Sequence, residues 1–202
     1  MNFNKLSIKD AIFISISLIL VIVFLLIINV QVFDFDVNVA SFISHLIVLI
    51  IVLVLNTKYV KRPKKILPNK TYHLLSALIA FLIAVIYIFI DEKADLEGNV
   101  YEVISSVFLA AIFEEITYRN IILKGLLNKY STLTAVVVSS VLFIISHFDV
   151  FLQPDKILML LVISGFSCWL FIKTRNITNC IILHSSYNLG VIFIPKAILL
   201  IQ

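Results

Sequence analysis

Long apolar runs separated by short polar stretches set the pattern of this chain. The runs have similar lengths and can be drawn at about 11–30, 39–55, 73–90, 101–124, 132–150, 156–172 and 177–194. Most approach the ~20 predominantly apolar residues that an α-helix needs to cross a bilayer. The pattern therefore predicts an all-α, polytopic transmembrane bundle of about seven spans, with six to eight compatible with the sequence. An eighth crossing or a re-entrant segment after Pro195 would move the C-terminus from the outside to the cytoplasm.

Composition supports a membrane protein. Of the 202 residues, 61% are hydrophobic and 14% are charged, whereas a soluble domain is about half apolar and a quarter charged. The opening segment resembles a signal peptide. However, its apolar run continues over residues 11–30 without a small-x-small cleavage site, so we expect a retained first span. The net charge of +4 does not indicate a nucleic-acid partner, because the basic residues lie in connections between spans.

The connections alternate in charge. Residues 58–70 contain six Lys or Arg side chains, whereas residues 91–97 are mainly acidic. Short loops rich in Lys and Arg stay on the cytoplasmic side of a membrane. We therefore expect the N-terminus and the 58–70 loop in the cytoplasm. The Ile-, Asn- and Lys-rich composition is typical of an AT-rich bacterial genome, which makes the bacterial plasma membrane the expected location of this multi-pass protein.

Two adjacent carboxylates, Glu114 and Glu115, interrupt the fourth apolar run. A charge at the centre of a spanning helix costs about 2.5–3.5 kcal/mol on the insertion scale. Arg119 follows Glu115 by one helical turn, so these two side chains share a face and can form an ion pair. Glu114 points about 100° away and has no local cation. Either the pair is structural and Glu114 lies near the headgroups, or the carboxylates have a function.

Polar side chains from two other runs reach a similar depth. Glu114 lies about 16 residues before the expected turn near 129–132, and His147 about 17 residues after it. At 1.5 Å per residue their depths agree within about 5 Å. His184 and Asn188 lie one turn apart on the last run. His147 could be an interfacial group, and His184 and Asn188 could form helix-to-helix hydrogen bonds, but the convergence of these groups indicates chemistry or ion movement.

Three further side chains are expected to be structural. His45 lies in the middle of the second run, and we expect no polar neighbour at helical spacing. Cys168 and Cys180 lie in apolar runs with neither zinc-ligand spacing nor a disulfide framework, so we interpret them as small core residues.

Three short motifs carry a family resemblance. EEITYR at residues 114–119 fits EExxxR, FIISH at 143–147 fits FxxxH, and HSSYN at 184–188 fits HxxxN/D. In this order, each on a hydrophobic segment, they resemble the motifs of the CPBP family of intramembrane proteases. That family includes the CAAX prenyl endopeptidases and the bacterial Abi, or bacteriocin self-immunity, proteins. The resemblance covers roughly residues 100–194. Asn120 departs from it, because bacterial members often have Gly after the motif arginine.

The resemblance implies an intramembrane endopeptidase that hydrolyses a peptide bond of a membrane-associated peptide or protein. Glu114 and His147 would activate a water molecule. His184 and Asn188 would donate hydrogen bonds to the tetrahedral oxyanion. The implied substrate is a peptide or protein such as a pheromone, a leader peptide or a bacteriocin-related protein, met at the lipid bilayer.

The same resemblance implies supporting roles. Glu115 would pair with Arg119 to hold the helix face in register, and Phe143 would pack behind His147 and fix its rotamer. The chain would then divide into N-terminal spans with a basic cytoplasmic loop, residues 1–70, and a CPBP/Abi-type catalytic core, residues 71–202.

Alternatives remain open from the residues alone. No cofactor is expected, but Glu114, His147 and His184 could form a His₂Glu zinc site with one open position, although no HExxH is present. A non-catalytic membrane immunity protein against a bacteriocin is a second class. A proton-coupled transporter fits less well, because it would favour Gly- or Pro-broken helices in corresponding halves.

Overall fold

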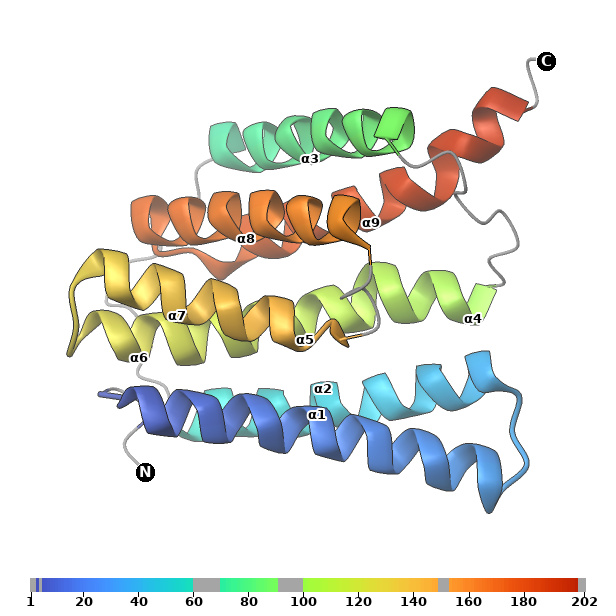
Figure 1. The fold of residues 1–202 in the computed structure, drawn as a ribbon, viewed down its shortest axis with the longest axis horizontal. Helices are drawn as coiled ribbons and strands as arrows, with labels where there is room; N and C mark the ends of the chain where they lie inside the picture. The colour runs from blue at the N-terminus through green and yellow to red at the C-terminus, as the bar shows by residue number, and fades with distance from the viewer. Residues whose placement is uncertain (1–2, 4, 60–69, 91–99, 149–152, 200–202) are drawn as a thin grey trace.

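A computed structural model of the chain describes residues 3, 5–59, 70–90, 100–148 and 153–199, and it is helical with no strand among them. Its long helices, labelled in Figure 1, are α1 (Ile8–Gln31), α2 (Val37–Tyr59), α3 (Lys70–Ile90), α7 (Thr132–Ile145), α8 (Pro154–Thr174) and α9 (Ile177–Leu199). Between α3 and α7 one continuous helical segment comprises α4 (Val100–Val103), η1 (Ile104–Ala110), α5 (Ala111–Glu115), η2 (Ile116–Leu123) and α6 (Lys124–Leu127). The predicted all-α fold class is confirmed.

Three of these helices are long and apolar enough to cross a membrane: Ile8–Gln31, Val37–Lys58 and Pro154–Thr174. Shorter apolar helices cover Thr71–Val85, Thr132–Ile145 and Ile177–Phe193. The chain is therefore a multi-pass membrane protein. About seven crossings stays a prediction.

The helices pack in layers along a common long axis (Figure 1). α1 and α2 form one outer pair, and α3 covers α9 on the other side. The 100–127 segment and α7 lie between them, where Phe143, Ile122 and Leu126 are fully buried. Candidate catalytic side chains on this central layer are therefore enclosed by helices on both sides.

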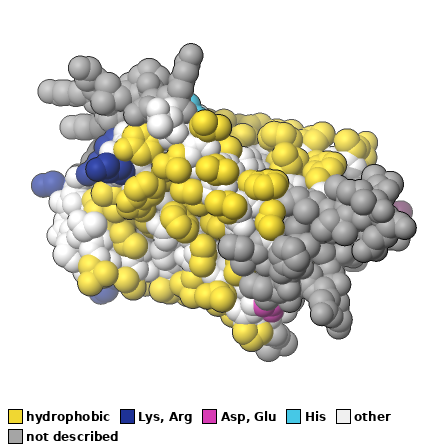
Figure 2. Space-filling view, turned by 90° about the horizontal axis from the view of Figure 1, so that it is seen from above, with side chains coloured by type: hydrophobic (Ala, Val, Ile, Leu, Met, Phe, Trp, Pro, Cys, Tyr) yellow, Lys and Arg dark blue, Asp and Glu magenta, His cyan; other side chains and the backbone are white. Residues whose placement is uncertain are grey.

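The outside of the bundle is apolar. Figure 2 shows hydrophobic side chains spread across one face, and on α1 the side chains of Phe13, Leu20, Phe24 and Ile27 are all more than half exposed. A water-soluble protein rarely shows so large a continuous apolar surface. Lipid contact explains it.

Basic residues cluster at one end of the helical bundle. The start of α1, the α6–α7 turn and the α8–α9 connection lie at one end of the bundle (Figure 1), and they carry Lys5, Lys9, Lys129, Lys173 and Arg175. This clustering agrees with the expectation that this end of the bundle faces the cytoplasm. The strongest topology signals, in the loops at 60–69 and 91–99, lie outside the described residues.

The segment that carries the adjacent carboxylates is not a uniform α-helix. The five-residue α5 holds Glu114 and Glu115 and is flanked by the π-helical η1 and η2. Short π-helical stretches inside helices occur frequently at functional sites, because they change which side chains share a face.

Candidate active site

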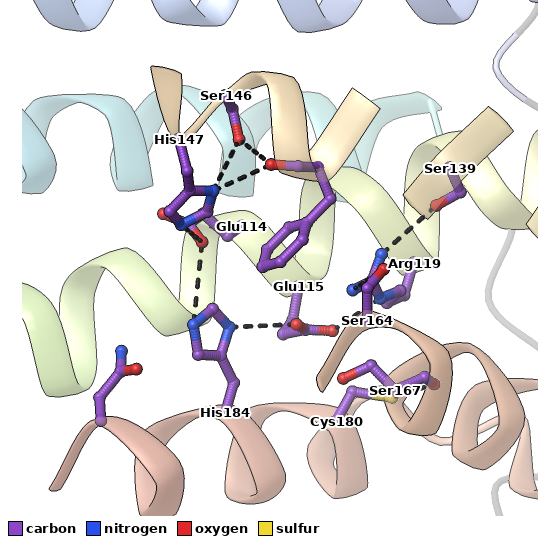
Figure 3. Close-up of polar contacts among 12 residues, drawn as sticks. Glu114, Glu115, Arg119, Ser139, Ser146, His147, Ser164, Ser167, Cys180 and His184 are labelled. Atoms are coloured by element: carbon purple, nitrogen blue, oxygen red, sulfur yellow. Dashed lines mark hydrogen bonds and ion pairs between the residues drawn. The ribbon is translucent and has the colours of Figure 1, made fainter. Parts of the chain in front are cut away.

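Glu114 lies in the wall of a cavity of about 550 Å³ that is lined by side chains from α1, α2, the 100–127 segment, α8, α9 and the residues that follow α7. Its Oε2 atom is 3.7 Å from His147 Nε2 and 3.9 Å from His184 Nε2 (Figure 3). These separations exceed direct hydrogen-bond distances. Oε2 is buried and accepts no hydrogen bond from the described residues. Polar groups held just beyond contact are suited to a bridging water molecule.

His147 lies just beyond the end of α7. The apolar run predicts a helix to about residue 150, but α7 ends at Ile145. The reason is local: the Phe143 carbonyl accepts from Ser146 Oγ at 2.6 Å and from His147 Nδ1 at 2.9 Å, which satisfies a carbonyl at the helix end. A carbonyl only accepts, so Nδ1 carries the proton. In neutral His147 the lone pair is then on Nε2, facing Glu114.

His184 contacts both carboxylates. Its Nδ1 is 3.1 Å from Glu115 Oε1, while its Nε2 faces Glu114. An ionised carboxylate only accepts hydrogen bonds, so Nδ1 is the donor. Neutral His184 therefore presents a lone pair at Nε2, and only its imidazolium form presents a donor there. The sequence did not predict the contact with Glu115.

Asn188 also lines the cavity. Its Nδ2 donates to the main-chain carbonyl of Ser106 at 2.8 Å, which uses one of the two amide hydrogens. The second hydrogen has no acceptor among the described residues and is available to a ligand.

Glu115 and Arg119 lie on the opposite side of the same helical segment, where their side chains are packed inside the protein. Both are fully buried, and Arg119 Nε is 3.1 Å from Glu115 Oε2, so the predicted ion pair is present. The guanidinium also donates to Ser139 Oγ at 3.4 Å and to Ser164 Oγ at 3.2 Å. These serines supply hydrogen bonds that a buried charge pair needs to offset its desolvation.

Phe143 lies between the buried Arg119 guanidinium and the two cavity histidines. Its ring centroid is 4.9 Å from Arg119 Cζ, 4.8 Å from the His147 ring and 5.7 Å from the His184 ring. The expected packing of Phe143 against His147 is present. The same ring also separates the buried guanidinium from the imidazoles.

His45 departs from the sequence expectation. It lines the cavity, and its Nδ1 forms hydrogen bonds with Ser105 Oγ and with Ser41 Oγ, the latter at 3.3 Å. The expectation of no polar neighbour at helical spacing was wrong, because Ser41 lies one turn earlier on the same face. That spacing, together with the rarity of histidine inside spanning helices, was the signal that could have identified His45. Cys168 and Cys180 are buried and free.

The zinc alternative stays a prediction. The described residues contain no group of three or more His, Cys, Asp or Glu side chains arranged to hold a metal ion. Of the three candidate ligands, Glu114 Oε2 lies 3.7 Å from His147 Nε2 and 3.9 Å from His184 Nε2.

The sequence model of one protein family matches residues 96–190. Its description is type II CAAX prenyl endopeptidase Rce1-like. Residues 96–190 are therefore similar to the Rce1-like family. The match includes every residue of the three motifs, and it confirms the resemblance to CAAX-type intramembrane proteases. No curated protein and no solved structure matches the chain.

The Rce1-like region does not build the whole cavity. Leu18, Ile22 and Val23 of α1 and His45 of α2 also line it, and these residues precede the matched range. The N-terminal helices therefore contribute part of the wall around a protease-family centre.

Proposed function

We propose that this protein is an intramembrane endopeptidase in which Glu114 and His147 activate a water molecule for attack on a peptide bond. The observation that carries the proposal is the arrangement around Glu114 Oε2, which faces two imidazole nitrogens at 3.7 and 3.9 Å inside a cavity. The similarity of residues 96–190 to a protease family supports it.

The inferred proton positions define the first step. A water molecule in the gap donates one hydrogen to Glu114 Oε2 and the other to His147 Nε2, since both atoms are acceptors. Its oxygen lone pair then points away from these bases and can attack the carbonyl carbon. As the new C–O bond forms, one water proton moves to Glu114 and the carbonyl electron pair moves onto the carbonyl oxygen. A positioned base typically contributes about 10²–10⁴-fold in rate.

Collapse of the tetrahedral intermediate completes the reaction. The oxyanion electrons re-form the C=O bond, the C–N bond breaks, and the proton held by Glu114 passes to the leaving nitrogen. The products are a carboxylic acid and an amine. We propose that the free amide hydrogen of Asn188 and, in the imidazolium form, Nε2–H of His184 stabilise the oxyanion.

The proposed substrate is a membrane-associated peptide or protein. The cavity wall is largely apolar outside the catalytic side chains, with Leu18, Ile22 and Val191 among its lining residues. An apolar wall suits a hydrophobic or lipidated segment that enters from the bilayer. A pheromone, a leader peptide or a bacteriocin-related protein has this character.

The decisive experiment compares wild type with Glu114→Gln in proteoliposomes. Two internally quenched probes are used, a farnesylated CAAX-type peptide and an unlipidated hydrophobic peptide. Gln keeps the shape of the side chain but cannot accept a proton from water, so we expect the cleavage rate to fall about 10²–10⁴-fold. Thermal unfolding measures the folded fraction of each variant. Equal cleavage rates at equal folded amounts would refute Glu114 as the base, and no cleavage of either probe by wild type would favour the non-catalytic immunity protein.

Metal independence is tested separately. We propose that no cofactor is needed, because the glutamate and histidine bases suffice to activate water. Cleavage should continue at an unchanged rate after dialysis against a chelator, and elemental analysis should find far less than one zinc per chain. Stoichiometric zinc that is lost together with activity, and restores it on addition, would replace this mechanism with the zinc-dependent one.

A further inference from the structure

His45 is a third imidazole in the cavity wall, and the proposed chemistry does not use it. It comes from α2, outside the Rce1-like region, whereas His147 and His184 come from inside it. Three contacts fix the ring. Nδ1 is hydrogen-bonded to the hydroxyls of Ser105 and Ser41, and the ring stacks on Phe113 with centroids 5.5 Å apart and an interplanar angle of 26°.

The two serines determine which ring nitrogen carries the proton. Their oxygens are 3.4 Å apart, and neither hydroxyl donates to a main-chain carbonyl among the described residues. If Nδ1 carried the proton, one of the two hydroxyl hydrogens would have no acceptor. If Nδ1 accepts, Ser105 can donate to Nδ1 and Ser41 to Ser105, so both hydroxyl hydrogens have acceptors. The one hydrogen then left without an acceptor in the described part of the chain is on Nε2, on a ring that lines the cavity, where water or a ligand can accept it. The neutral ring therefore has its proton on Nε2.

That Nε2–H group has no hydrogen-bond partner among the described residues. It belongs to a side chain that lines the cavity, and Phe113, on which the ring stacks, directly precedes Glu114. The cavity that holds the proposed base thus also presents a fixed neutral donor, in addition to the donors assigned to the oxyanion. Such a donor needs a ligand acceptor. A peptide supplies one at every residue, its main-chain carbonyl oxygen.

We propose that His45 is a substrate-binding residue whose Nε2–H donates to a main-chain carbonyl of the bound peptide, next to the bond that is cut. The inference rests on the proposed endopeptidase function and adds to it a role for the N-terminal helices. Because the carbonyl is bound in both the ground state and the transition state, His45 governs KM rather than kcat.

The test measures kcat and KM separately in proteoliposomes, with the quenched probe that wild type cleaves faster. His45→Phe keeps a ring to stack on Phe113 but removes the donor. We expect its KM to rise about 3- to 10-fold, the effect of one neutral hydrogen bond, with kcat changed less than twofold. His45→Gln places an amide N–H near the position of Nε2 and should restore most of the affinity. His45→Asn reaches only the position of Nδ1 and should not.

Two controls keep the result interpretable. His73→Phe on α3 makes the same change at a histidine that does not line the cavity, and its KM should match wild type. Binding of the probe to Glu114→Gln, with and without His45→Phe, measures affinity without turnover and should weaken by the same factor as KM rises.

Three outcomes would overturn the inference. An unchanged KM in His45→Phe would show that no substrate hydrogen bond is made. Equal losses of kcat and thermal stability in the Phe and Gln variants would make His45 structural. A Gln variant no better than Phe would exclude a donor role. Each of these can occur while Glu114→Gln is inactive, so they are distinguishable from failure of the endopeptidase proposal, in which Glu114→Gln cleaves like wild type.

Discussion

Glu114 and Glu115 are adjacent in sequence and lie in opposite environments. Glu114 faces the cavity, and its Oε2 atom has imidazole nitrogens at 3.7 and 3.9 Å but accepts no hydrogen bond from the part of the chain that the structure describes. Glu115 is fully buried and contacts Arg119 and His184, each at 3.1 Å. The rotation of about 100° between successive helical residues is enough to place one carboxylate in each environment.

The difference shows how two adjacent positions on one helix can separate the proposed catalysis from folding. On the buried side of the helix, Ser139 and Ser164 complete the hydrogen bonding of Arg119. The charges of Glu115 and Arg119 are therefore compensated and held in place. On the cavity side, the carboxylate lacks such compensation and has room to exchange a proton with water. Removing a charge should therefore damage stability on one side and turnover on the other.

The largest expected effect is the loss of stability in Glu115→Gln. The substitution leaves the buried Arg119 without its counter-ion, and breaking a buried pair typically costs about 3–5 kcal/mol. Thermal unfolding in detergent and the amount of folded protein in membranes measure it. The matched control is Glu114→Gln, which removes an uncompensated charge and should unfold at the wild-type temperature or above it.

A double variant sharpens this comparison. Glu115→Gln combined with Arg119→Gln removes both charges, so neither charge is left buried without its partner. The double variant should therefore unfold at a higher temperature than Glu115→Gln alone. If instead the two losses add, Glu115 and Arg119 stabilise the fold independently and the contrast between the two sides is wrong.

A smaller effect is expected for Asn188→Ala on the cavity side. Removing one oxyanion donor typically lowers kcat about 10²–10³-fold, and KM should change little because the oxyanion exists only after attack. The variant also deprives the Ser106 carbonyl of a hydrogen bond, so a modest drop in unfolding temperature is expected. Steady-state kinetics on the cleaved probe checks both parameters. A rise in KM with unchanged kcat would assign Asn188 to substrate binding instead.

Much of this architecture could be predicted from the sequence because it depends on local spacing. Run lengths predicted the helices, a four-residue spacing predicted the Glu115–Arg119 pair, and equal distances from one turn placed His147 near Glu114. These relations follow from helix geometry. The four-residue spacing rule holds even though the π-helical η2 follows α5, since the Glu115–Arg119 ion pair is present in the structure.

What the sequence could not predict depends on tertiary contacts. The hydrogen bond from His184 to Glu115 spans 69 residues, and the contact of His45 with Ser105 spans 60. The rotation between α9 and α5, or between α2 and η1, decides whether such groups meet, and helical periodicity does not specify it. The end of α7 was mispredicted because an apolar run contains no signal for the hydrogen bonds that Ser146 and His147 make to the Phe143 carbonyl.

The separation of the two carboxylates also has an evolutionary consequence. A glutamate codon becomes a glutamine codon by one base change, so a gene copy can lose the proposed catalytic base at Glu114 in a single mutation. The buried network of Glu115, Arg119, Ser139 and Ser164 would remain intact, and the product would still fold and enter the membrane. The same change at Glu115 would be removed by selection as a folding defect. This scaffold is therefore one substitution away from a stable pseudoprotease, free to acquire a binding role with the same cavity.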